Sequence, residues 1–72
     1  MKANIVLKKA QIALNNVEVT TIMSHIVAFH LNKEMENPVV YRLLYESEAT
    51  IDQHSDYVHV CVPKRIVTIE FI

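Results

Sequence analysis

The sequence predicts an all-β fold, a small sandwich or barrel of five or six short antiparallel strands. Two observations support this prediction. Val and Ile, with ten and eight copies, far outnumber Leu, and glycine is absent, which favours strands over helices. Apolar and polar residues also alternate with a period of two along several stretches, as they do in half-buried strands. Residues 22–36 also admit a helix, which would make the fold α+β.

The C-terminal third is the clearest stretch. Residues 57–62 and 66–72 are two β-branched runs on either side of residues 63–65, and they predict a β-hairpin on which the rest of the fold packs. Three residues of the first run share one strand face and are expected to point into the core: Val58, Val60 and Val62. The alternate residues share the other face: Tyr57, His59 and Cys61.

The N-terminal part predicts a hairpin. Residues 4–14 alternate as a half-buried strand, and residues 17–21 continue as the returning strand. Between them stand Asn15 and Asn16, and Asn is the best non-glycine residue for the positive φ angles of a two-residue turn.

Residues 22–36 are the ambiguous segment. As a helix, the segment would place apolar residues almost all the way around its axis, with Lys33 and Glu34 on the most apolar arc. A strand over residues 25–31, followed by a polar loop, is therefore favoured.

The centre of the chain predicts one more strand and a loop. Pro38 suits the entry to a strand over residues 39–45, because proline imposes an extended conformation on the preceding residue and cannot donate to a ladder. Residues 46–56 contain four acidic residues and no Lys or Arg, which is typical of a solvated loop.

Size and composition favour self-association. Residues 1–72 form a single domain, and a domain this small buries only about 60% of the surface that its unfolded chain exposes. One cysteine excludes an internal disulfide, while 51% of the residues are hydrophobic. Homo-oligomerisation is the expected supplement to stability. The predicted interface residues are Phe29, Leu31, Ile66, Glu70, Phe71 and Ile72.

Charge limits the partners. The formal net charge of -1 lacks the basic excess of a duplex-binding domain, so a nucleic-acid partner is not favoured. A single-stranded nucleic acid or a small nucleotide is the alternative ligand, held by tyrosines and basic residues. The residues of this alternative site are Lys8, Lys9, Tyr41, Arg42, Tyr45, Lys64 and Arg65. No apolar run approaches the roughly 20 residues of a membrane span, which predicts a cytoplasmic or other intracellular protein, or one associated with a virion.

Catalytic and metal sites are not predicted. His59 and Cys61 share a strand face, but the chain lacks a second cysteine and the usual spacing of zinc ligands. Cys61 lies between two valines, whereas a reactive thiol needs an electropositive setting. We therefore expect no metal, no cofactor and no enzymatic activity. The sequence predicts a module that acts by protein–protein association, such as a structural or accessory component of a virion, or an inhibitor that docks on a host enzyme.

Overall fold

The computed structural model describes residues 1–33 and 37–72, and it confirms the predicted set of antiparallel strands. The described residues form six strands, one α-helix and a 3-10 turn. In chain order these are β1 (Lys2–Leu7), β2 (Ile12–Ile22), β3 (Ile26–Asn32), α1 (Pro38–Glu46), β4 (Thr50–Gln53), β5 (Tyr57–Pro63), the 3-10 turn η2 (Lys64–Ile66) and β6 (Val67–Phe71).

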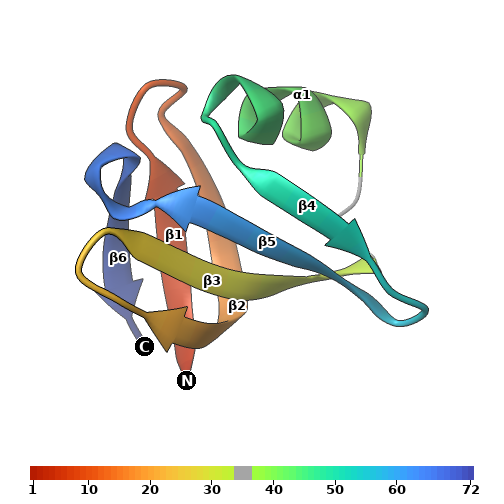
Figure 1. The fold of residues 1–72 in the computed structure, drawn as a ribbon, viewed down its shortest axis with the longest axis horizontal. Coiled ribbons are helices and arrows are strands. Elements are labelled where there is room, and N and C mark those ends of the chain that lie inside the picture. Colours follow the sequence, from red (N-terminus) through yellow and green to blue (C-terminus); the bar gives the residue numbers. More distant parts are fainter. Residues whose placement is uncertain (34–36) are drawn as a thin grey trace.

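The strands belong to one sheet in the order β4-β5-β3-β2-β1-β6, with antiparallel neighbours throughout. Figure 1 shows that this sheet folds over on itself, so that β1, β2 and β6 lie behind β3, β4 and β5 and run across them. The helix α1 lies beside β4 at one end of the molecule. The folded sheet thus encloses a core on its inner face and leaves β4 and β6 as its two edges.

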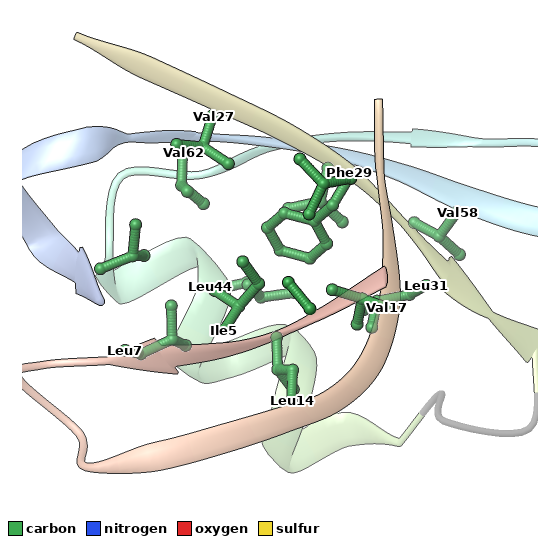
Figure 2. Close-up of a cluster of buried hydrophobic side chains, with 14 residues drawn as sticks. Ile5, Leu7, Leu14, Val17, Val27, Phe29, Leu31, Leu44, Val58 and Val62 are labelled. Atoms are coloured by element: carbon green, nitrogen blue, oxygen red, sulfur yellow. The ribbon is translucent and has the colours of Figure 1, made fainter. Parts of the chain in front are cut away.

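The core collects apolar side chains from every large element. Figure 2 shows residues of β1, β2, β3 and β5 converging around the ring of Phe29, with Leu44 of α1 pointing into the same cluster. The predicted core face of the first C-terminal run is confirmed, because Val58, Val60 and Val62 are almost completely buried. Alternation along the strands therefore identified the inner face correctly.

The first hairpin turns earlier than the sequence predicted. The chain reverses over residues 8–11, where Gln11 takes a positive φ of 53° and donates a backbone hydrogen bond to Leu7. Asn15 and Asn16 instead lie within β2, where the pairing with β1 shifts between Ala3 and Ile5. Asn16 has a φ of 57°, so its tolerance of this conformation serves a β-bulge rather than a turn.

The predicted strand over residues 39–45 is wrong, because these residues form most of α1. Asn37 is the N-cap, and its side-chain oxygen accepts a hydrogen bond of 3.0 Å from the backbone N–H of Val40. Pro38 follows in the first turn of the helix, where its missing N–H costs nothing. The Asn-Pro pair was thus a helix start, and helical spacing brings Leu44 completely into the core.

The alternative helix over residues 22–36 is not formed by the described part of this segment. Ile26–Asn32 form β3, which confirms the favoured strand, and residues 34–36 lie outside the described residues. The predicted acidic loop over residues 46–56 is corrected as well, since it contains the last residue of α1 and the whole of β4.

The two C-terminal runs are strands, but they do not form a hairpin. β5 pairs with β3 and β4, whereas β6 pairs with β1. Between them, η2 redirects the chain from one side of the folded sheet to the other (Figure 1). Backbone hydrogen bonds join Lys64 to His25 and Lys8 to Ile66, so this crossing is tied to both neighbouring turns. Each strand can then place its apolar face against the common core.

Candidate functional site

The predicted interface residues divide between the core and an exposed edge. Phe29 and Leu31 are 0% and 1% exposed, so their assignment to an interface is corrected: both belong to the interior of a single chain. Ile66 is half-buried and packs against the core from η2. Glu70, Phe71 and Ile72 are exposed at the C-terminal end of the chain.

The β6 edge presents backbone groups in a direction that the register defines. Ile72 donates its N–H to Lys2, and Lys8 donates its N–H to Ile66, which identifies the hydrogen-bonded pairs of the β1–β6 ladder. Because such pairs alternate with non-bonded pairs, Thr68 and Glu70 also direct their backbone groups toward β1. Ile69 and Phe71 therefore direct their N–H and C=O groups away from the sheet. The N–H of Val67 is bonded to Lys64 within η2, which leaves the C=O of Val67 on this edge.

Exposed apolar side chains surround the C-terminal end of this edge. Phe71 and Ile72 are 52% and 75% exposed, and Met1 is 64% exposed. A hydrogen bond from the N–H of Ile72 to the C=O of Lys2 brings both chain ends together on adjacent strands, as Figure 1 shows. The β6 edge thus combines outward backbone groups with the exposed apolar side chains of Phe71 and Ile72 at its C-terminal end.

A column of rings stands on the outer face of β3 and β5. The ring of Tyr57 stacks against His30 at 4.0 Å and against His54 at 4.6 Å between centroids, and His59 meets His30 edge-on at 5.2 Å. The shared face of Tyr57 and His59 was predicted from strand alternation, but the contribution of His30 depends on the pairing of β3 with β5. Imidazoles cover both faces of Tyr57, so its ring offers no open face to a nucleic-acid base.

The electrostatics of this column centre on His30. Desolvation lowers the pKa of His30 below its ordinary value of 6.5, the neighbouring His59 and His54 lower it further, and Glu18 acts in the opposite direction. A hydrogen bond from the N-terminal ammonium of Met1 lowers the pKa of Glu18. His30 is therefore predominantly neutral at pH 7, and the column can remain stacked there.

The predicted nucleic-acid residues are only partly brought together. Lys64 and Arg65 line a cleft of about 320 Å³ with Ser24 and His25, at the junction of η2 and the β2–β3 turn. The turn that carries Lys8 and Lys9 lies beside η2. The other three predicted residues lie on α1: Tyr41, Arg42 and Tyr45. The hydroxyl of Tyr41 accepts a hydrogen bond from the side chain of Gln53. Sequence reasoning missed Ser24 and His25, because only the tertiary fold brings that turn to η2.

Two further observations concern metals and membranes. Within residues 1–33 and 37–72, no group of three or more His, Cys, Asp or Glu side chains is placed to hold a metal ion. The same residues contain no helix that is long and apolar enough to cross a membrane.

Comparison with known proteins adds no family assignment: no family model, no curated protein and no solved structure matches this chain.

Proposed function

We propose that this protein is a non-enzymatic association module that self-associates by antiparallel pairing of β6 with β6 of a second copy. The observation that carries the proposal is the β6 edge, which combines outward backbone groups with exposed Phe71 and Ile72. An edge of this kind is a template for a further strand unless it is covered or charged. A structural or accessory role in a larger assembly, such as a virion, is one use of such a module.

The register follows from which backbone groups point outward. Two-fold pairing centred on Ile69 lets each Ile69 exchange both of its backbone hydrogen bonds with Ile69 of the second copy. The N–H of Phe71 then reaches the C=O of Val67 of the second copy, and the symmetric bond forms as well. This register uses every outward donor of Ile69 and Phe71, and it needs no change in the β1–β6 ladder.

Side-chain charge favours the same register. Centring the two-fold axis on Ile69 sets Glu70 opposite Thr68 of the second copy, whereas centring it on Glu70 would set two carboxylates directly opposite each other. Like charges at opposed positions destabilise a strand pair. On the inner face, Phe71 would lie against Val67 of the second copy and lose part of its exposed apolar surface.

The expected complex is weak. A single strand pair with few apolar contacts forms a narrow interface, and association must overcome the loss of translational and rotational freedom. We expect a dissociation constant on the order of micromolar for the dimer. Assembly at high local concentration, as in a larger complex, would then populate the paired state.

The decisive experiment combines mass measurement with a backbone modification. Sedimentation equilibrium over a range of concentrations should show a shift from one chain to two. A chemically synthesised chain with an N-methyl group on Ile69 should stay folded but remain monomeric, because it loses only an outward donor. The unmethylated synthetic chain is the control. A wild-type chain that stays monomeric at all concentrations, or an N-methylated chain that dimerises equally well, would refute the proposal.

A further inference from the structure

The cleft between η2 and the β2–β3 turn concentrates hydrogen-bond donors. Four side chains line its volume of about 320 Å³, and none of the four carries a carboxylate: Ser24, His25, Lys64 and Arg65. The backbone N–H of Lys64 donates to the C=O of His25 over 2.8 Å, which holds the two turns together. The hydroxyl of Ser24 lies 3.0 Å from Nδ1 of His25, so these two side chains are also positioned by each other.

Positive charge extends beyond the cleft. The hydrogen bond of 3.0 Å from Lys8 to Ile66 places the β1–β2 turn beside η2, and this turn also carries Lys9. Four of the seven Lys and Arg residues of the chain are therefore in two neighbouring turns. A chain with a formal charge of -1 thus has a local excess of positive charge at this end.

Acidic residues only partly offset this charge. The carboxylate of Glu48 lies 2.7 Å from the guanidinium of Arg65, and both side chains are mostly exposed. Glu46 shares a separate, smaller cleft with Lys9. An exposed ion pair contributes little free energy, so an anion of higher charge can compete with Glu48 for Arg65.

We infer that this cleft binds a phosphate group, carried either by a free nucleotide or by the backbone of a single-stranded nucleic acid. Lysine supplies a point charge, arginine a planar fork of donors, and serine and histidine neutral donors, which together match the several acceptor oxygens of a phosphate. The volume is at the lower end for ligand pockets, as expected for a phosphate and its immediate attachment. The site is separate from the outward groups of β6, so it adds a ligand to the proposed association module.

Nuclear magnetic resonance can locate the site. The isotope-labelled chain is titrated with inorganic phosphate at constant ionic strength, with chloride as the control. Phosphate should shift the backbone amides of residues 24–25 and 64–66, and chloride should not. The absence of phosphate-specific shifts at these amides would overturn the inference.

Substitutions in and beside the cleft should weaken or strengthen the binding of an oligonucleotide. Fluorescence anisotropy with a labelled oligothymidine should show about tenfold weaker binding after Lys64→Gln combined with Arg65→Gln, because two charge contacts are removed. Glu48→Gln should strengthen binding about threefold, since it releases Arg65 from its ion pair. Lys2→Gln, at the opposite end of β1, is the matched control and should leave binding unchanged. Equal effects of Lys2→Gln and the double variant would show non-specific attraction and overturn the site.

Competition distinguishes the two sources of the phosphate. If the partner is a strand, oligothymidine should bind more tightly than adenosine monophosphate, and binding should weaken with salt by a log–log slope of about -0.7 for each phosphate contact. If the partner is a free nucleotide, adenosine monophosphate should compete at a concentration similar to that of the oligomer. Failure of β6 pairing would not affect either result, because the cleft belongs to one chain.

Discussion

The two edges of the sheet, β4 and β6, are built differently. β4 has four residues, includes Asp52, and is connected to its surroundings by side-chain hydrogen bonds at Gln53. Gln53 donates to the hydroxyl of Tyr41 on α1 and accepts from the ammonium of Lys33, each over 3.0 Å. β6 has five residues, its single charged side chain is Glu70, and it leads directly into the exposed Ile72.

The difference shows how a small sheet can protect one edge and leave the other available. Short length, charge and cover by a helix are the usual means of preventing edge-to-edge pairing. β4 is short, carries Asp52 and has α1 beside it, and this helix is anchored in the core by Leu44. β6 is one residue longer and also carries one acidic residue, Glu70, but no helix lies beside it in Figure 1. This contrast is the reason for proposing self-association at β6 rather than at β4, and four predictions test it.

The largest effect is expected at the anchor of the helix beside β4. Leu44→Ala removes a completely buried side chain and should lower the free energy of unfolding by about 2–5 kcal/mol in urea denaturation. Val39→Ala, on the same helix but 51% exposed, is the control and should change it by less than about 0.5 kcal/mol. Hydrogen exchange at β4 should accelerate more than at β6. Equal acceleration of both edges would mean that α1 does not protect β4 selectively.

The next prediction concerns the direction of the backbone groups in β6. Glu70→Pro removes an N–H that points toward β1, so it should lower the free energy of unfolding by about 1–3 kcal/mol. Phe71→Pro removes an outward N–H and should be tolerated better by the fold, while it prevents dimerisation. Thermal unfolding and sedimentation together measure both effects. A larger loss of stability for Phe71→Pro than for Glu70→Pro would contradict the register.

A smaller effect tests the register of the dimer through charge. Thr68 is exposed on the outer face, and the proposed pairing sets it opposite Glu70 of the second copy. Thr68→Glu should weaken the dimer about fivefold, because it sets a like charge opposite Glu70 in both symmetric pairs. Thr68→Lys should strengthen the dimer by a similar factor, because it sets an opposite charge there. The dissociation constants can be compared by sedimentation. Changes of the same sign in both variants would exclude this register.

The smallest effect is the contribution of His30, on β3 between the two edges, to the pH dependence of the free energy of unfolding. The pKa of folded His30 lies below its ordinary value of 6.5, so the unfolded chain binds more protons in that range. The free energy of unfolding should therefore fall as the pH falls through 6.5 toward the lower pKa of the folded protein. The depressed pKa of Glu18 produces a separate loss, below 4.5.

Urea denaturation at about pH 7.5 and about pH 5.5 measures the histidine contribution. The His30→Gln variant should show a shallower decline over this range than the wild type. The dimer should respond little to the same change of pH, because β6 carries no histidine. An identical decline in both proteins would show that other groups control the pH dependence.

Local patterns identified the strands better than the helix. Alternation correctly located the buried face of β5, because side chains of a strand must point to opposite sides whatever it pairs with. The strand predicted over residues 39–45 failed because its apolar residues satisfy both a strand and a short helix. There the Asn37-Pro38 cap determined the outcome, and it could have been recognised as a helix start.

The residues of the candidate sites could be predicted less completely from the sequence than the strands. Phe71 and Ile72 were predicted as interface residues, and both side chains are exposed. Phe29 was also predicted as an interface residue, but it lies in the core, on a strand in the middle of the sheet. Lys64 and Arg65 were predicted as ligand-binding residues because of their charge. The residues that line the cleft with them, Ser24 and His25, are about 40 positions away in the chain. Sequence spacing contains no information about such a contact.

By itself, the sequence determined the predominance of strands, the apolar face of β5 and the location of positive charge in residues 64–65, because these depend on side-chain chemistry and a period of two. Only the tertiary structure decided that β5 and β6 separate, that α1 lies beside β4 and that β6 is left as an edge without a helix beside it. Those features depend on which strands pair across the core, and pairing is set by the burial of all apolar faces together rather than by any one segment.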